Sequence, residues 1–143
     1  MIACFDAKYA YWFWRPAQAI PAAAADGNDA TVADSAWQPM AATPGFPEYP
    51  SAHSCHSAAL TEALSAFFGT DRIHLMIDSR VTGATRSYAR FRDVVREVES
   101  ARVLAGFHFR HSDEDGSRLG RQVARYVIAR GFAQEPAGMS GAR

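Results

Sequence analysis

Residues 50–69, PSAHSCHSAALTEALSAFFG, decide the fold class because they read as one helix with both of its ends marked. Ser51 follows Pro50, and a serine at this point caps the free amide groups of a first helical turn. Apolar residues then recur at helical spacing, at positions 60, 63, 64, 67 and 68. Gly69 is the usual residue at the end of a helix. We therefore expect an α-helix that begins after Ser51 and ends at Gly69.

The chain on both sides of this helix extends the helical pattern. Residues 2–20 are predicted to be helical, with an interruption or end near Pro16, and a strongly amphipathic helix is predicted over 91–105. A last helix is expected over about 114–131, whereas residues 72–85 are ambiguous and include at most a short extended piece. The side chains expected to face inward are Phe91, Val94, Val95, Val98, Leu119, Val123 and Val127. The sequence therefore predicts an all-α fold, a helical bundle.

Between the first two helical regions, residues 21–50 lack helical periodicity and contain five prolines. Loops of this length in compact domains are usually functional or mobile. We predict one domain over residues 1–133, in which 21–50 form a long active-site loop. Residues 134–143 contain Pro and Gly at close intervals and are predicted to be a flexible tail.

Composition limits the partners of the chain. A length of 143 residues suits a single domain, and a formal net charge of zero argues against nucleic acid or acidic membranes as partners. No apolar run reaches the roughly 18 residues of a membrane span. No signal peptide is visible, so the compartment is unknown and the cytoplasm is the default expectation. Cys4 and Cys55 leave open a disulfide or two buried thiols.

Lys8 and Arg15 form the first candidate pair. On a continuous helix, a spacing of seven puts both side chains on one face, about 10.5 Å apart along the axis. The intervening sequence YAYWFW is almost entirely apolar, which predicts a buried helix whose cations need a counter-charge. No acidic residue lies at helical spacing to pair with Arg15. We expect the two cations to bind an anion; the alternative is a solvated basic face.

Two further pairs follow along the chain. Ser51 and His53 stand at a helix start, where free backbone amides bind anions, although plain capping with a surface histidine is the alternative. Arg102 and His108 bracket Gly106, and on a continuous helix they would point about 120° apart. If the helix ends near Gly106, the chain could turn and bring His108 back toward Arg102. The alternative is a helix-terminal arginine and an incidental histidine.

Taken in order, these pairs resemble the motifs K-x6-R-P, P-S-G-H and S-R-x5-H-x3-D of the superfamily of vanadium-dependent haloperoxidases and type-2 phosphatidic acid phosphatases. The resemblance covers roughly residues 6–130. Ala52 replaces the motif glycine, and Ala101 replaces the motif serine. Ser112 stands where the family has an aspartate that hydrogen-bonds the far nitrogen of the nucleophilic histidine. Asp113, one residue further, is the candidate substitute.

The resemblance implies a role for each motif residue. Lys8, Arg15 and Arg102 would neutralise a phosphate or vanadate, with hydrogen bonds added by Ser51 and the Ala52 amide. His108 would be the nucleophile toward phosphorus or the vanadium ligand. The acid–base residue would be His53, and Lys8 would also polarise bound peroxide. A helical bundle of the haloperoxidase and acid phosphatase type is the implied fold, with this chain as a C-terminal fragment that lacks upstream helices.

The wording around the motifs resembles the haloperoxidase branch, which predicts a vanadate-dependent enzyme that oxidises halide with hydrogen peroxide. Phe46, seven residues before His53, is similar to the chloroperoxidase type, and we assign Phe46 and Trp14 to a halide or substrate pocket; the alternative for Phe46 is a loop anchor. Two other functions stay open: a soluble acid phosphatase that hydrolyses phosphomonoesters through a phosphohistidine, and an inactive anion-binding remnant. A second copy could cover the aromatic face of residues 5–14, as a homo-oligomer.

Overall fold

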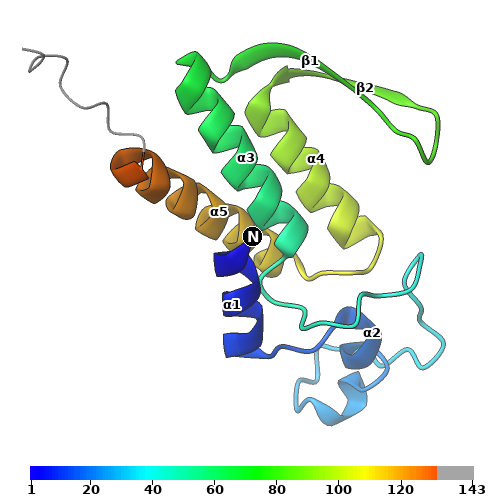
Figure 1. Cartoon of the computed structure of the whole chain (residues 1–143). Coiled ribbons are helices and arrows are strands. Elements are labelled where there is room, and N and C mark those ends of the chain that lie inside the picture. The colour runs from blue at the N-terminus through cyan, green and yellow to red at the C-terminus, as the bar shows by residue number, and fades with distance from the viewer. Residues whose placement is uncertain (132–143) are drawn as a thin grey trace, which may run out of the picture.

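The computed structural model describes residues 1–131 and is mostly helical (Figure 1). Three long helices contain most of the helical residues, and shorter elements extend from their two ends. The elements in chain order are α1 (Ile2–Tyr11), α2 (Pro16–Ala19), the 3-10 turn η1 (Ala23–Ala25), α3 (Ala52–Phe68), β1 (Arg72–Asp78), β2 (Thr85–Arg90), α4 (Phe91–Leu104) and α5 (Arg110–Gly131).

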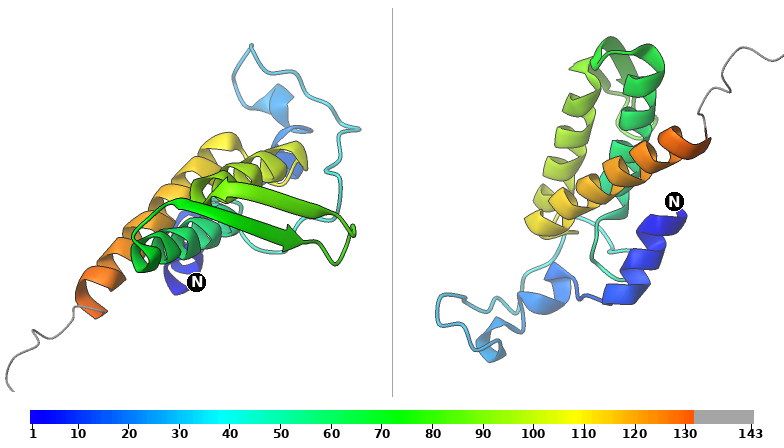
Figure 2. Two further views of the ribbon diagram at one scale, coloured as in Figure 1. Left: turned by 90° about the horizontal axis from the view of Figure 1, so that it is seen from above. Right: turned by 90° about the vertical axis from the view of Figure 1, so that its left-hand side faces the viewer.

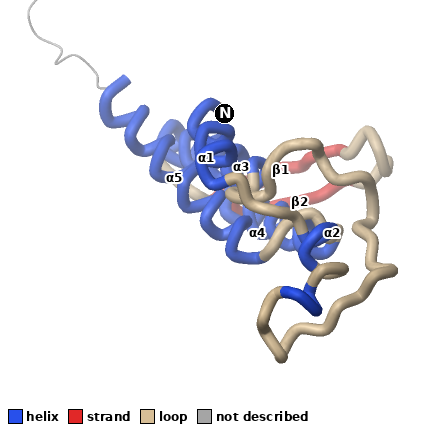
Figure 3. Tube along the Cα trace, turned by 90° about the horizontal axis from the view of Figure 1, so that it is seen from below, coloured by secondary structure: helices blue, strands red, loops and turns tan. Residues whose placement is uncertain are grey.

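Helices α3, α4 and α5 form the bundle. α3 and α4 lie side by side, and α5 crosses them obliquely, as the views in Figures 1 and 2 agree. The hairpin of β1 and β2 lies at one end of the bundle, and the long loop between η1 and α3 lies at the other. Figure 3 looks onto that second end and shows that the loop is almost wholly irregular. The candidate residues all come from this loop end.

Helix α3 has the ends that the sequence predicts. The Ser51 hydroxyl accepts a hydrogen bond from the Ser54 amide, and Gly69 has a positive φ of 66° that suits a residue without a Cβ. The side chains that α3 buries are small ones, among them Ala52, Cys55 and Ala58. Small side chains let a neighbouring helix approach closely.

The neighbour that approaches is α5, through Gly116, Gly120 and Ala124. A Cβ on Gly116 would lie 2.5 Å from the carbonyl oxygen of Ser51, and one on Gly120 would overlap the carbonyl of Cys55. The two backbones are therefore in direct contact. The Ser51 amide also donates to the carbonyl of Ser112 at 2.9 Å. Close packing thus fixes the start of α3 against the start of α5.

The all-α prediction is wrong for residues 72–90. The segment expected to be ambiguous forms an antiparallel two-stranded hairpin, with Leu75 opposite Tyr88 and Asp78 opposite Thr85. Its side chains are mostly exposed, and Val81 at the tip is 95% exposed. The hairpin buries too little surface to show the alternation of apolar and polar residues by which strands are recognised.

The N-terminal prediction is also partly wrong. α1 ends at Tyr11, well before Pro16, because Trp12 adopts a left-handed conformation with φ 49°. Arg15 is extended and precedes α2. Lys8 and Arg15 therefore do not share one continuous helix. The aromatic side chains between them are largely exposed, Trp12 at 70%, so the expected burial of this segment does not hold within this chain.

At the other end, α5 begins at Arg110, four residues earlier than expected, and Val127 is 46% exposed instead of facing inward. Small residues of α5, not its larger apolar ones, make the main contact with α3. The predicted tail, 134–143, lies outside the described residues. Within 1–131, no helix has the length and apolar character needed to cross a membrane.

Cys4 and Cys55 form a disulfide that joins α1 to α3, which decides between the two possibilities that the sequence left open. Cys55 is completely buried and Cys4 nearly so. The bond closes a loop across 51 positions of the sequence, which corresponds to about 4 kcal/mol of stabilisation on the chain-entropy account. The helix that carries Lys8 is therefore covalently attached to the helix that carries Ser51 and His53.

Candidate functional site

The loop segment Phe46–Glu48 holds the first two cations in place. Lys8, which is completely buried, donates from Nζ to the carbonyl oxygens of Pro47 and Glu48, each at 2.9 Å. Arg15, 5% exposed, donates to the carbonyl of Phe46 through Nε at 3.3 Å and Nη2 at 3.0 Å. The ring of Phe46 lies 5.1 Å from Lys8 Nζ and 5.4 Å from Arg15 Cζ. The two cations therefore meet through the loop, although not along one helix.

The turn after α4 brings in the third cation. α4 ends at Leu104, and Gly106 takes a positive φ of 73° against the side chain of Trp37. The chain then reverses, so that the carbonyl of Phe107 accepts from Arg15 Nη1 at 2.9 Å and its ring lies 4.4 Å from the Arg102 guanidinium. The predicted helix end near Gly106 is confirmed. Arg15 and Arg102 both contact Phe107, Arg15 at its carbonyl oxygen and Arg102 at its ring.

None of these three cations has a carboxylate oxygen within 4.0 Å among residues 1–131. Arg102 Nε is buried and has no hydrogen-bond partner at all in that range. Burial, followed by the charges of Arg15 and Arg102, lowers the pKa of Lys8 to about 8 against the opposing effect of Glu48. Burial also lowers the pKa of Arg15, and Arg102 adds to that effect. Lys8 and Arg15 are buried, Arg102 is half-buried with a buried Nε, and three cations this close favour an anion beside them.

The start of α3 adds hydrogen-bond donors. Ser51 and Ala52 are buried, and the amides of Ala52 and His53 have no backbone or side-chain acceptor within residues 1–131. Free amides at a helix start favour an anion. His53 is exposed on the first turn. Partial burial, then the charges of Arg102 and His108, lower its pKa, so His53 is neutral near pH 7 and could accept a proton.

A carboxylate orients His108, and it belongs to Glu48. The Oε1 atom of Glu48 lies 2.8 Å from His108 Nδ1 and accepts from the Phe109 amide at 2.9 Å. Oε2 accepts from the Ser112 hydroxyl at 2.7 Å. The suggestion that Asp113 takes over the missing aspartate's role is therefore wrong. Position 112 does contact the relevant carboxylate, but as a donor.

Asp113 is instead part of the support beneath α3. Its Oδ1 accepts from the Ser54 hydroxyl at 2.6 Å, while Oδ2 is buried and has no partner within the described chain. Burial raises the pKa of Asp113 above its usual value, against the effect of hydrogen bonds from Ser54 and Ser51. Asp113 also acts to raise the pKa of Arg102. It therefore offsets part of the positive charge of the site from behind the helix start.

The electrostatics of Glu48 and His108 define a neutral imidazole beside an ionised carboxylate. Burial acts to raise the pKa of Glu48, but hydrogen bonds from His108, Ser112 and Phe109 outweigh it and leave the pKa below its usual value. Burial lowers the pKa of His108 more than Glu48 raises it. Nδ1–H then donates to Glu48. His108 Nε2 makes no hydrogen bond within residues 1–131 and is free for a ligand or reacting atom.

These residues fit a tetrahedral oxyanion such as vanadate or phosphate. The fit rests on the orphaned Nε of Arg102, on the buried cations Lys8 and Arg15 without carboxylate partners, and on the uncommitted Nε2 of His108. Clusters of His, Cys, Asp or Glu that could hold a bare metal cation do not occur in residues 1–131. The site is therefore cationic, and suited to a group that arrives as an anion.

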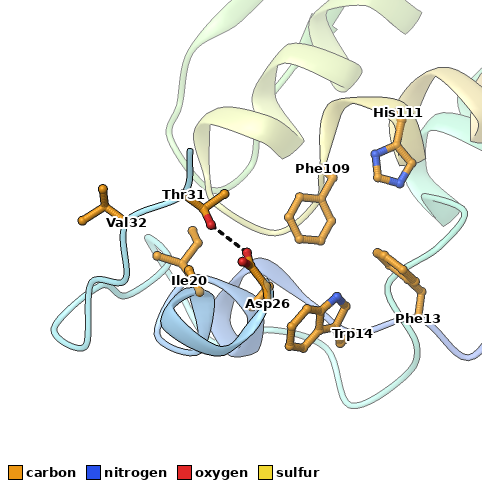
Figure 4. Close-up of a pocket in the computed structure, with 10 residues that line it drawn as sticks. Phe13, Trp14, Ile20, Asp26, Thr31, Val32, Phe109 and His111 are labelled. Atoms are coloured by element: carbon orange, nitrogen blue, oxygen red, sulfur yellow. Dashed lines mark hydrogen bonds between the residues drawn. The ribbon is translucent and has the colours of Figure 1, made fainter. Parts of the chain in front are cut away.

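Two cavities lie beside the site. Trp14 and Phe46, both assigned to a substrate pocket, line one of about 560 Å³ together with Arg15. A second, of about 390 Å³, is mostly apolar, and Figure 4 shows Phe109 and His111 on one side of it and Phe13 and Trp14 on the other. Trp14 precedes Arg15 and lines both cavities. The cavities thus border the segment that carries one of the cations.

Sequence reasoning missed Glu48, which is the residue that holds His108. A usable indication was present: Glu48 is a lone acidic residue in the stretch FPEYP, directly before the second motif. The motifs place the carboxylate in the third motif, and this expectation drew attention to positions 112 and 113. Only the contact between residues 46–48 and 107–112, sixty positions apart, reveals the exchange.

Known proteins share this fold. The family described as "VCPO second helical-bundle domain" matches residues 1–135. The crystal structure titled "first bacterial vanadium dependant iodoperoxidase" is 32% identical, with a TM-score of 0.77 over 90% of this chain and 29% of that one. No curated protein sequence matches significantly.

Two further structures, the apo and holo types of a bacterial vanadium-dependent chloroperoxidase, are each 20% identical and share the fold. Their TM-scores are 0.65 and 0.64, over 80% of this chain and 30% and 29% of theirs. The chain thus spans less than a third of the length of these three structures. Because the family match covers residues 1–135 of 143 and the motifs stand in the same order, the chain belongs to the vanadium haloperoxidase superfamily.

Proposed function

We propose that this chain forms the vanadate-binding part of a haloperoxidase that oxidises halide with hydrogen peroxide. The observation that supports this most is a group of three cations, the buried Lys8 and Arg15 and the half-buried Arg102. Within residues 1–131 these cations lack carboxylate partners, and they lie next to a histidine with a free Nε2. Burying a charge without a counter-ion is costly even when backbone carbonyls bind it, as they do for Lys8 and Arg15, so an anion that neutralises the group explains the arrangement.

Each residue has a task in this proposal. Lys8, Arg15 and Arg102 bind the oxyanion's oxygens, and the Ser51 hydroxyl and Ala52 amide donate hydrogen bonds at the helix start. His108 presents Nε2 to the central atom. When bound, vanadate supplies a Lewis acid that binds and activates hydrogen peroxide. Lys8 would donate a hydrogen bond to bound peroxide, and His53, neutral near pH 7, would accept and return a proton.

The cavity shared by Phe46, Trp14 and Arg15 is the proposed route for halide. A halide entering it would meet aromatic edges and one buried guanidinium. The similar structures are those of an iodoperoxidase and a chloroperoxidase, and we propose the same class of reaction, halide oxidation, for this chain. The Cys4–Cys55 disulfide favours an oxidising compartment over the cytoplasm as its place of work.

A phosphomonoesterase is the second candidate. The hydrogen bond from Nδ1–H to Glu48 leaves Nε2 as a nucleophile, and the same cations would stabilise a phosphoryl group in transfer. Inorganic phosphate and vanadate would then compete for one site. An anion-binding remnant without turnover is the third candidate.

Turnover assays separate these candidates. The full chain, with vanadate, peroxide and iodide, bromide or chloride, is expected to halogenate a phenolic indicator, and His108→Ala is expected to abolish the reaction. Hydrolysis of a chromogenic phosphomonoester without any halogenation would transfer the assignment to a phosphatase. If vanadate raises the melting temperature but neither reaction occurs, the remnant is the correct reading. No shift with vanadate, phosphate or sulfate would refute the oxyanion site itself.

A further inference from the structure

Glu48 is completely buried, and every hydrogen bond of its carboxylate goes to the segment 108–112. A buried carboxylate is tolerated only when its lone pairs are satisfied, and three donors satisfy this one. Its backbone carbonyl meanwhile accepts from Lys8 at 2.9 Å. A single residue therefore joins the buried lysine to the histidine that faces the oxyanion.

We propose that Glu48 is the positioning residue for His108, in an exchange by which it supplies the carboxylate that the motif has at the position of Ser112. In this chain the carboxylate comes from the loop before α3, and Ser112 has become a hydroxyl donor to it. The proposal rests on the proposed function, since it concerns the same imidazole.

The exchange has a direct chemical consequence at His108. A carboxylate at Nδ1 keeps the proton on that nitrogen and leaves the lone pair on Nε2. Oε1 of Glu48 also accepts from the Phe109 amide, so it fixes the backbone beside His108 as well as the ring. Loss of Glu48 would release both the tautomer and the orientation of the imidazole, while Ser112 alone offers no charge to replace it.

Only one of the two positions can carry the carboxylate. The Ser112 hydroxyl lies 2.7 Å from Glu48 Oε2, and both residues are completely buried. An aspartate at 112 would set a second negative charge against Glu48 in a completely buried position, where repulsion between charges is strong. Restoring the motif by Ser112→Asp is therefore expected to harm the site, unless Glu48 is removed at the same time.

Four variants of the full chain test the exchange: Glu48→Ala, Glu48→Gln, Ser112→Asp and the double variant Glu48→Ala with Ser112→Asp. Glu114→Ala, an exposed carboxylate of α5, is the matched control. The first readout is the nitrogen-15 NMR spectrum of the His108 ring, which reports the tautomer without any ligand. The second readout is the dissociation constant for vanadate.

We expect Glu48→Ala to shift His108 away from the Nδ1–H tautomer and to weaken vanadate binding about 10- to 100-fold, the usual effect of losing such a partner. Ser112→Asp should weaken binding comparably, and the double variant should recover both the tautomer and most of the affinity. Glu48→Gln preserves the shape and an acceptor for Nδ1, so its tautomer should be retained even if Glu48→Ala unfolds.

Two results would overturn the proposal: an unchanged His108 tautomer in Glu48→Ala, or losses in the two single variants that simply add in the double variant. The tautomer does not depend on turnover, so the test is separate from that of the proposed function. A wild-type chain without halogenation whose tautomer follows Glu48 would refute the haloperoxidase and retain the positioning role. Halogenation that survives in Glu48→Ala would support the haloperoxidase and refute the positioning role of Glu48.

Discussion

The exposed arginines of the surface differ from the group of Lys8, Arg15 and Arg102 in how their positive charges are paired. Five exposed or half-exposed arginines each have a carboxylate within 4.0 Å: Arg86, Arg92, Arg96, Arg118 and Arg125. Pairs at such positions contribute at most about 1 kcal/mol. Lys8, Arg15 and Arg102, where a missing partner costs far more, have none in residues 1–131.

This difference shows that the chain keeps cations without carboxylate partners at one place, where their burial is energetically unfavourable. Carboxylates are as common as cations in the sequence, 15 of each, so their supply does not explain the lack of partners. The two carboxylates near the site, Glu48 and Asp113, are instead bonded to His108 and to Ser54. The cations are thus left available for a ligand. The protein without ligand is less stable as a result, a trade-off that is common at active sites.

The largest effect should come from detaching the helix that brings Lys8 into the buried group. Replacing both cysteines, Cys4→Ala with Cys55→Ala, is expected to lower the free energy of unfolding by about 4 kcal/mol, because the denatured chain gains the freedom of an open loop. Denaturant unfolding of both forms without reductant measures it. An equal midpoint for the two forms would mean that α1 is held by its other contacts.

The second effect concerns the ligand directly. Arg102→Met removes a guanidinium whose Nε has no partner, so the apo protein should keep its stability while vanadate affinity falls about 10- to 100-fold, the equivalent of a charge-assisted hydrogen bond. Calorimetric titration measures the affinity, and Arg86→Met serves as the surface control. Comparable losses in both variants would erase the contrast between the two regions.

The third effect is a pH dependence that only the buried group should show. The pKa of Lys8 is about 8, so the apo protein loses this charge as the pH rises through 8, and anion binding must weaken with it. Sulfate keeps one charge state over this range. Its affinity should fall about tenfold between pH 7 and pH 9, one unit above the pKa.

Lys8→Arg is the control for that experiment, because an arginine stays protonated throughout the range. Its sulfate affinity should change much less between pH 7 and pH 9 than that of the wild type. If both proteins lose affinity in parallel, another group controls binding and the lowered pKa of Lys8 is irrelevant to the ligand.

The smallest effect should appear at the surface. Arg86→Ala breaks the ion pair with Glu97. The side chain of Arg86 is 66% exposed and that of Glu97 is 41% exposed. Solvent and salt screen such a pair, so the free energy of unfolding should fall by less than about 1 kcal/mol, and by less still in high salt. Vanadate affinity should not change. A larger loss would show that the hairpin depends on its charges more than its exposure implies.

Local sequence information was sufficient to predict helix ends and chain reversals, because these depend on residues within a few helical turns of one another. Ser51 and Gly69 mark the ends of α3, and Gly106 marks the reversal that returns His108 toward Arg102, as predicted. The hairpin of residues 72–90 was missed because it is mostly exposed and shows no clear periodicity. The break at Trp12 was missed because a left-handed tryptophan has no signature in composition.

The sequence by itself determined the family, the helical bundle, and the order of cations and histidines along the chain, because short motifs and helical periodicity are local properties. Tertiary structure alone decided the Cys4–Cys55 bond, the meeting of Lys8 and Arg15 on the carbonyls of residues 46–48, and the use of Glu48 in place of an aspartate. Each of these joins positions that lie tens of residues apart. Their partners lie on separate elements that meet only in the folded chain, as α3 and α5 do in their close backbone contact, and such contacts cannot be read from one element alone.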